Sequence, residues 1–303
     1  MNTDTRIAGL SGVRKRYGSI VALDGIDLDI HRGELVALLG PNGAGKSTSI
    51  GLLLGLQRAD AGEVVLFGGD PQEIATRRRI GVMLQSAELP PTLKVGELLR
   101  LTASYYPAPR DPTECAAIAG ITNLLDRRYG KLSGGQQRRV QFALAIVGGP
   151  ELLFLDEPTV GMDIDARQSL WAAIRRMLRE GCAVVLTTHY LEEAEALADR
   201  VCVIAKGRVV SQGSVDSLRA HVALRRIRCI TTLDAAAIAA WPEVVSVDMQ
   251  QGRLTIATAQ AEVVVRRLLD GDPALCELEV QRAGLAEAFQ EITRDTDAVQ
   301  EAA

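Results

Sequence analysis

A glycine-rich run near the start of the chain has the residue types of a phosphate-binding loop. This loop, called the glycine loop below, consists of Gly40, Pro41, Asn42, Gly43, Ala44, Gly45, Lys46, Ser47 and Thr48. Its glycines permit positive φ values and let consecutive backbone N–H groups approach anionic oxygens closely. Lys46 would reach the β- and γ-phosphates, and the Ser47 hydroxyl would hold Mg²⁺. The pattern predicts a site for a nucleoside triphosphate.

The segments on either side of the glycine loop fit a strand and a helix. The apolar run Leu35–Leu39 precedes the loop, and a leucine-rich segment with Ile50, Leu53 and Leu54 follows it. A strand, a loop and a helix in this order place the phosphates at a helix N-terminus, where backbone N–H groups and the helix dipole favour anions.

Two carboxylates end a second apolar strand. Asp156 and Glu157 follow Leu152–Leu155 directly, and ligands of open α/β sheets bind outside the carboxyl ends of the strands. We expect Asp156 to support the Mg²⁺ held by Ser47 and Glu157 to polarise an attacking water. The alternative is a strand capped by two solvated acids, which is common for an isolated pair but fits less well beside a glycine loop.

A second segment has the features of an anion site. Ser133 precedes the helical stretch 137–146 as a candidate N-cap. The intervening residues, Gly134, Gly135 and Gln136, expose backbone N–H groups near the helix N-terminus. One triphosphate needs only one phosphate-binding loop. The second site therefore suggests that each chain completes the pocket of another subunit.

Composition and charge narrow the class of protein. The 303-residue chain carries 34 basic and 38 acidic side chains, a formal net charge of −4, so no global basic field favours nucleic acid. The five cysteines are scattered without Cys-x-x-Cys spacing, and we expect reduced, mostly buried thiols of a cytoplasmic protein. We see no signal peptide and no apolar run of about 18 residues, so any membrane role requires a partner.

The hydrophobic patterns predict a nucleotide-binding domain over residues 1–220. Its first part, 7–39, is a β layer with turns at Gly18, Gly25 and Gly33, and a helical insertion covers about 86–147. Helices then alternate with strands, which predicts a parallel α/β sheet. The expected helices are 95–106, 113–119, 133–147, 164–179 and 190–198, and the expected strands are 152–155, 183–187, 201–204 and 208–211.

A small α+β domain is predicted over 221–303. Its elements follow the order β-α-β-β-α-β, the split βαβ arrangement. They are expected at 223–231, 235–240, 244–249, 253–258, 260–269 and 275–281, with a turn at Gln251-Gly252 and a final helix near 284–293. The domain has no phosphate loop, metal spacing or catalytic cluster, which favours a regulatory or dimer-supporting role over a ligand-sensing one.

Taken in order, these motifs resemble those of the ATP-binding cassette (ABC) transporter ATPases over residues 7–215. The resemblance implies a P-loop NTPase fold of the ABC type with a helical signature subdomain. It also implies a head-to-tail homodimer that holds ATP between the glycine loop of one protomer and the Ser133–Gln136 signature of the other. ATP and Mg²⁺ would be the cofactors.

The resemblance also assigns roles to single residues. Tyr17 would stack on adenine, with a core or β-edge tyrosine as the alternative. Gln85 would touch Mg²⁺ and water, although alone it would be an ordinary polar strand end. His189 would sense the γ-phosphate, although a lone histidine is usually structural. Asp163 lies in the loop that crosses the dimer interface, where Met162 replaces the usual leucine.

Segment 89–98 resembles the part of these ATPases that receives a membrane subunit; otherwise it is an ordinary surface loop and helix start. Segments 157–163, 191–200 and 284–289 look most like the daunorubicin-resistance and multidrug exporter branch. We therefore expect a peripheral ATPase at the cytoplasmic membrane face that drives export of a drug, antibiotic or lipid-like substrate through a separate permease, without nucleic acid. Alternatives are a soluble ATPase of translation or DNA repair and a nucleotide-binding scaffold without turnover.

Overall fold

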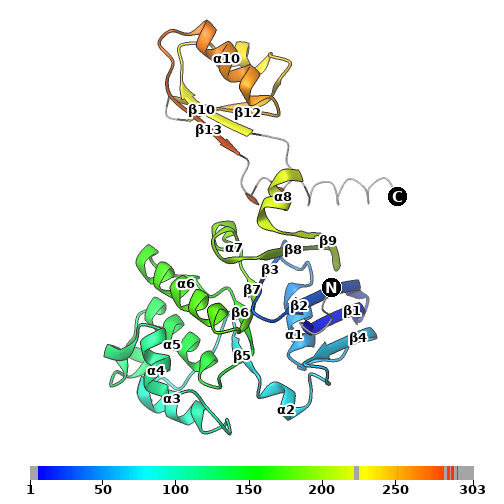
Figure 1. Ribbon diagram of the computed structural model, residues 1–303, viewed down its shortest axis with the longest axis vertical. Coiled ribbons are helices and arrows are strands. Elements are labelled where there is room, and N and C mark those ends of the chain that lie inside the picture. The colour runs from blue at the N-terminus through cyan, green and yellow to red at the C-terminus, as the bar shows by residue number, and fades with distance from the viewer. Residues whose placement is uncertain are drawn as a thin grey trace. The chain divides into compact units, whose positions relative to one another are not determined.

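The chain forms two compact units in the computed structural model, Met1–Ser214 and Val215–Ala303 (Figure 1). The structure describes residues 6–221, 225–250, 252–282, 285–286, 288–289 and 292. The break between the units precedes the expected boundary at 220, because helix α8 (Val215–His221) is grouped with the second unit.

A six-stranded sheet forms the centre of the first unit. Its order is β5-β6-β7-β3-β8-β9, and all neighbours pair in parallel except the terminal β8–β9 hairpin. The strands are β5 (Ile80–Met83), β6 (Leu152–Asp156), β7 (Ala183–Thr187), β3 (Leu35–Leu39), β8 (Arg200–Ala205) and β9 (Arg208–Gly213). Strands β3 and β7 are buried at every position, as expected of strands covered on both faces.

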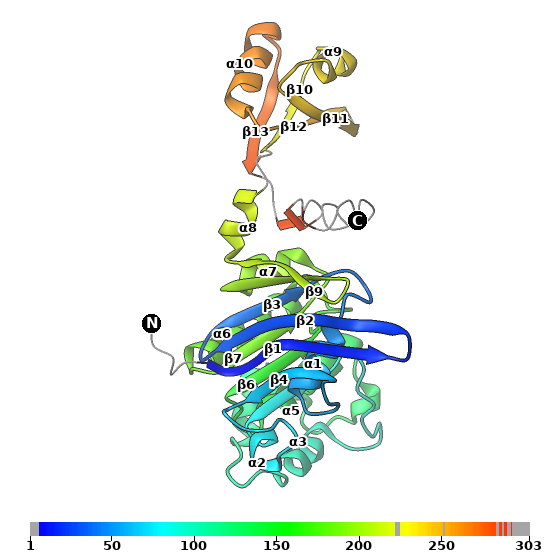
Figure 2. The ribbon, with the colours of Figure 1, turned by 90° about the vertical axis from the view of Figure 1, so that its right-hand side faces the viewer.

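A three-stranded antiparallel sheet forms a second layer, in the order β2-β1-β4. Its strands are β1 (Arg6–Tyr17), β2 (Ile20–His31) and β4 (Ala61–Leu66), which lie side by side in Figure 2. Gly18 and Gly33 lie in turns as predicted, but Gly25 does not. It lies inside β2 with φ 76°, between partners Asp24 and Ile26, and so forms a bulge that needs a left-handed residue.

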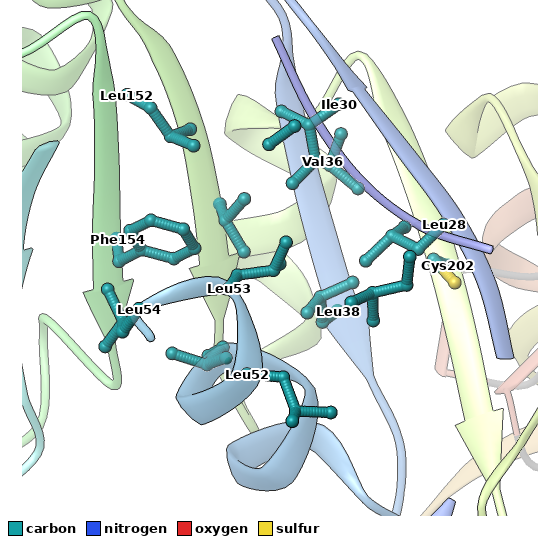
Figure 3. Close-up of a cluster of buried hydrophobic side chains, with 14 of the residues drawn as sticks. Leu28, Ile30, Val36, Leu38, Leu52, Leu53, Leu54, Leu152, Phe154 and Cys202 are labelled. Carbon is teal, nitrogen blue, oxygen red and sulfur yellow. The ribbon is translucent and has the colours of Figure 1, made fainter. Parts of the chain in front are cut away.

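Helix α1 (Lys46–Leu53) fixes the glycine loop to both sheets. Figure 3 shows Leu52 and Leu53 of α1 beside Phe154 of β6 and Leu38 of β3, with Leu28 of β2 close by. All five side chains are at most 2% exposed. Burying a leucine or phenylalanine side chain contributes about 1.5–3 kcal/mol. This apolar cluster therefore packs α1 against β3, which fixes the positions of the two ends of the glycine loop relative to each other.

The helical insertion lies between β5 and β6 in the sequence. Its helices are α3 (Val95–Ala103), α4 (Pro112–Ile118) and α5 (Gly134–Ile146), with 3₁₀ turns at Thr122–Leu124 and Tyr129–Lys131. Helix α2 (Ile74–Arg77) precedes β5, and α6 (Ile164–Arg179) and α7 (Leu191–Leu197) follow β6 and β7. Helix α3 ends earlier than predicted because Ser104 caps it, while Asp111 and Pro112 start α4.

The second unit has the predicted split βαβ order and its own core. Its four-stranded sheet has the order β11-β12-β10-β13 with antiparallel neighbours. The elements are β10 (Arg225–Ile230), α9 (Ala235–Ala239), β11 (Val244–Gln250), β12 (Arg253–Thr258), α10 (Ala261–Gly271) and β13 (Cys276–Arg282). Ile227, Ile256 and Leu268 are buried between sheet and helices. Gln251 and half of the predicted helix 284–293 lie outside the described residues.

A buried carboxylate joins two loops of the second unit. Asp272 is 3% exposed and accepts hydrogen bonds from the Thr231 hydroxyl (2.6 Å) and from the N–H groups of Thr232 (2.7 Å) and Ala274 (2.9 Å). These hydrogen bonds lower the pKa of Asp272 to about 2. In the same unit, the Trp241 ring lies 4.4 Å from the Arg267 guanidinium.

The cysteines are free thiols, as predicted, and Cys276 is the exposed one. The buried ones are Cys115, Cys182, Cys202 and Cys229. Burial raises the pKa of Cys182 to about 12 and that of Cys202 to about 11, so these thiols stay protonated and unreactive. Within the described ranges, no helix has the length and apolar character needed to span a bilayer.

Candidate nucleotide-binding site

The glycine loop joins the carboxyl end of β3 to the N-terminus of α1. Gly45 is the N-cap residue, with φ 111°, and no side chain caps the helix. A Cβ atom on Gly45 would lie 2.6 Å from Leu23 Cδ2 and 2.8 Å from the Ala22 carbonyl oxygen. Glycine is therefore required both by conformation and by space. The uncapped N–H groups of the first turn are available for an anion.

Lys46 folds back over the glycine loop. Its ammonium donates hydrogen bonds to the carbonyl oxygens of Gly40 (2.6 Å) and Pro41 (3.0 Å). Burial lowers the pKa of Lys46, and the charges of Glu157 and Asp156 oppose that shift. A phosphate in the loop would add a negative charge, which raises the pKa of Lys46.

One cavity of about 230 Å³ contains the predicted metal residues and most of the predicted phosphate residues, whereas Gly40 and Pro41 do not line it. It is bounded by the glycine loop from Asn42 to Thr48 and by Gln85, Asp156 and Glu157. These residues come from the carboxyl ends of β3, β5 and β6. The parallel sheet brings them together because its strand ends share one edge.

The donors that line this cavity suit magnesium. Ser47 offers a hydroxyl, Gln85 an amide and Asp156 a carboxylate, and Mg²⁺ prefers such hard oxygen donors together with substrate phosphates. The described residues contain no group of three or more His, Cys, Asp or Glu that would hold a metal alone. A magnesium site here would thus be completed by the nucleotide.

The two strand-end acids have different surroundings. An Asp156 carboxylate oxygen accepts a hydrogen bond from the Thr187 hydroxyl of the adjacent strand β7. Glu157 has φ 51°, which is left-handed, and its N–H donates to the Thr187 carbonyl oxygen at 3.0 Å. A non-glycine residue in this conformation costs about 1–3 kcal/mol, and such strain concentrates at functional sites.

His189 contacts Glu157 directly. Its Nδ1 lies 2.6 Å from Glu157 Oε2, and its backbone N–H donates to the same oxygen at 3.4 Å. The Glu157 side chain is 13% exposed and that of His189 is 57% exposed. The sequence placed both residues at one sheet edge, and the structure adds that the imidazole orients the carboxylate.

The Ser133–Gln136 signature starts helix α5 with a capping box. Ser133 Oγ accepts the N–H of Gln136 at 3.4 Å, and Gln136 Oε1 accepts the N–H of Ser133 at 3.1 Å. A Cβ on Gly134 would meet no atom within 4 Å, so the approach to the helix N-terminus is open there. Neither Ser133 nor Gln136 lines the glycine-loop cavity of its own chain.

Tyr17 and Asp163 lie outside that cavity. Tyr17 is 46% exposed, and its hydroxyl donates to Gln57. Asp163 caps α6 by accepting the Ala166 N–H at 2.8 Å. Ile20 and Val21 line the cavity instead, although they are 68% and 43% exposed. Sequence reasoning missed these two residues; their apolar side chains directly after a turn were the available signal.

Sequence reasoning also missed two buried charged residues, Glu193 and Arg138. Glu193 is fully buried and accepts hydrogen bonds from the Thr159 hydroxyl (3.3 Å) and the Trp171 indole N–H (3.0 Å). Burial raises the pKa of Glu193. Arg138 is 7% exposed. Both lie in helices with many polar residues, where the sequence gives no sign of burial.

A strand, a glycine loop and a helix beside two strand-end acids define a P-loop nucleoside triphosphatase. The family model described as ABC transporter matches residues 23–160. The daunorubicin resistance ATP-binding protein DrrA3 of Streptomyces coeruleorubidus is 38% identical over 318 residues, with 99% of each chain covered. The Nod factor export ATP-binding protein I of Burkholderia orbicola (strain AU 1054) is 39% identical over 213 residues, 68% of this chain and 70% of that one. The chain belongs to the ABC transporter ATP-binding proteins.

A solved structure agrees with this assignment. The dimeric structure of a bacterial ABC transporter cassette matches with a TM-score of 0.62 and 28% identity, covering 68% of this chain and 98% of that chain. The family resemblance, the P-loop fold and the prediction of an ATP-hydrolysing transporter subunit are confirmed.

Proposed function

We propose that this chain powers export of a drug, antibiotic or lipid-like molecule through a separate membrane permease. The observation that carries the proposal is the match to a daunorubicin resistance ATP-binding protein along 99% of both chains, which includes the second unit. A second relative, matched over 70% of its length, is named for Nod factor export. The permease would hold the ATPase at the cytoplasmic face of the membrane.

In this proposal the glycine-loop cavity binds the phosphates of ATP. Backbone N–H groups at the start of α1 and the Lys46 ammonium hold the β- and γ-phosphates, which replace the Gly40 and Pro41 carbonyl oxygens as partners of Lys46. Ser47, Gln85 and Asp156 supply oxygen donors for Mg²⁺. Mg²⁺ held by these residues would supply positive charge that offsets the charge of the phosphates.

Glu157 acts on the attacking water. A water oxygen forms a bond to the γ-phosphorus while the bond to the bridging oxygen of the β-phosphate breaks, and Glu157 accepts the proton of the water. His189 Nδ1 holds the Glu157 carboxylate at 2.6 Å, which leaves the other ring nitrogen to contact the γ-phosphate. Gln85, which follows the end of β5, lines the same cavity.

Two copies would bind ATP head to tail. The open N-terminus of α5, with Ser133, Gly134, Gly135 and Gln136, would contact the γ-phosphate held by the partner subunit's glycine loop. Asp163 would lie at the interface between subunits. Tyr17 would stack on adenine, beside the apolar side chains of Ile20 and Val21. The dimeric cassette structure supports this assembly.

A groove beside the nucleotide cavity fits the permease. It has a volume of about 590 Å³ and is lined by residues that include Gln85, Leu89, Pro91 and Tyr129. Gln85 lines both the groove and the nucleotide cavity. A cytoplasmic segment of the permease in this groove would therefore contact the residue proposed to touch Mg²⁺ and water.

A tagged pull-down from detergent-solubilised native membranes tests the proposal. We expect a polytopic membrane protein at about equal stoichiometry, and we expect Leu89→Asp to remove it without loss of ATP binding. Leu101→Asp is the matched control, because Leu101 is 46% exposed on α3 and does not line the groove. Recovery with ribosomes or nucleic acid, and without a membrane protein, would support the soluble ATPase instead.

A further inference from the structure

Arg138 connects the signature helix to the catalytic strand ends. It lies in α5, little more than one turn after the Ser133 N-cap. Nη1 donates to the carbonyl oxygens of Leu84 (2.9 Å) and Gln85 (3.0 Å). Nη2 donates to the carbonyl oxygens of Asp156 (3.4 Å) and Glu157. One guanidinium thus binds main-chain oxygens at the ends of both β5 and β6.

The charge of Arg138 makes these bonds hard to replace. Gln141 Oε1 accepts a further hydrogen bond from Nη1 at 2.9 Å. Burial lowers the pKa of Arg138, and the charges of Asp156 and Glu157 oppose the shift, so the guanidinium remains charged. Its N–H donors have a fixed planar arrangement, which an ammonium cannot reproduce. The side chain therefore fixes the distance between these strand ends as well as their contact with α5.

Helix α5 is also fixed at its other end. Gly81 of β5 lies against the Ala145 carbonyl oxygen, and any Cβ at this position would collide with that oxygen. The helix rise of about 1.5 Å per residue puts Ser133 about 7 Å from Arg138 along the axis. A shift of the signature end must therefore be transmitted to the Gln85 and Glu157 backbone through Arg138.

We propose that Arg138 is a positioning residue that couples the two nucleotide sites of the dimer. This inference rests on the proposed function, in which the signature binds the partner subunit's ATP while Gln85 and Glu157 act on the ATP of their own chain. Closure of the signature on one nucleotide would align Glu157 and Gln85 for hydrolysis of the other. Arg138 contacts the backbone of both residues and leaves their side chains free to act.

Steady-state ATPase assays on the full chain test the coupling. Arg138→Met keeps an extended side chain but removes the guanidinium. We expect kcat to fall by about 10²-fold, the loss typical of a misplacement of about 1 Å, and the Hill coefficient for ATP to fall toward one. The affinity of the monomer for a fluorescent ATP analogue should stay within about twofold, since Arg138 does not line the glycine-loop cavity.

Arg139→Met is the matched control. Arg139 is the next residue of α5, but its guanidinium donates to the Gly120 carbonyl oxygen (3.0 Å), away from both strand ends. This variant should keep the parental kcat and Hill coefficient. An equal loss in the Arg139 variant would mean that α5 is merely destabilised and would overturn the coupling role.

If Arg138→Met does not fold, Arg138→Lys tests the coupling instead. The lysine ammonium retains the positive charge but lacks the planar arrangement of N–H donors. We therefore expect a thermal melt close to that of the parent, with a kcat between those of the parent and the Arg138→Met variant. Parental kcat and cooperativity in a folded Arg138 variant would refute the inference. Glu157→Gln in the same assay separates the two proposals: if it retains turnover, the role of Glu157 in the proposed mechanism fails, whereas its inactivity beside fully active Arg138 variants rejects only the coupling.

Discussion

The two units hold charged side chains in opposite ways. In the first unit, Lys46 is held by two carbonyl oxygens of its own loop and faces a cavity that Asp156 and Glu157 share. In the second unit, Asp272 is surrounded by donors from its own loops, and its pKa falls to about 2. The carbonyl oxygens that bind Lys46 can be replaced by the oxygens of a ligand, whereas Asp272 already accepts hydrogen bonds from groups of its own loops.

Sheet architecture explains this difference. The parallel strands β3, β5 and β6 end at one edge, so polar residues from distant parts of the sequence meet there. The antiparallel sheet of the second unit alternates strand directions, and its buried Asp272 joins only the neighbouring loops at 231–232 and 272–274. A charged side chain held by hydrogen bonds therefore indicates a ligand site only when its partners can be replaced.

The largest effect should come from Glu157→Gln. A positioned acid–base group typically accelerates a reaction by about 10²–10⁴-fold, so turnover should fall by that factor while ATP binding persists. Phosphate release and nucleotide affinity measure the two properties. Glu180→Gln, on the surface at the end of α6, is the control and should hydrolyse ATP normally. Undiminished hydrolysis by the Glu157 variant would show that another group serves as the base.

A smaller effect, on binding itself, should follow Lys46→Ala. Charge-assisted hydrogen bonds contribute about 1.5–3 kcal/mol, so ATP affinity should fall roughly ten- to hundredfold. Equilibrium titration with a fluorescent ATP analogue measures the change. Arg77→Ala removes an exposed cation from α2 and should leave affinity unchanged. If both variants bind ATP like the parent, Lys46 only stabilises its own loop, as Asp272 does in the second unit.

The smallest effect should come from Asp272→Asn and should spare ATPase activity. The ordinary pKa of about 3.9 falls to about 2 in the folded chain. A depressed pKa stabilises the fold above about pH 4, and this contribution is lost as the pH falls toward 2. Circular dichroism should show that the variant is less stable at neutral pH, with a shallower loss of stability on acidification.

Asp234→Asn provides the matched control for that experiment. Asp234 precedes α9 in the same unit, but its side chain makes no capping hydrogen bond. Its replacement should leave the acid titration unchanged. If the Asp272 variant and the parent lose stability identically on acidification, Asp272 does not stabilise the second unit, and the contrast between the two units fails.

Sequence patterns predicted the local features and missed those that depend on distant contacts. The glycine loop and the acids at 156–157 could be found because consecutive residues build each one, and the order of elements predicted the parallel sheet and the sheet of the second unit. Arg138 could not be found, because its partners at the ends of β5 and β6 are remote in the sequence. Gly25 was assigned to a turn because glycine is equally suited to a bulge, and only strand pairing distinguishes the two.

The tryptophans have a practical consequence. The chain has two, with Trp171 in the first unit and Trp241 in the second. The Trp171 indole N–H donates to Glu193, which also binds Thr159 of the loop that follows Glu157. A chain carrying Trp241→Phe would therefore fluoresce from a single indole connected to that loop. Each unit thus contains one tryptophan, and we expect the Trp171 fluorescence to change when nucleotide binding moves that loop, without any attached dye.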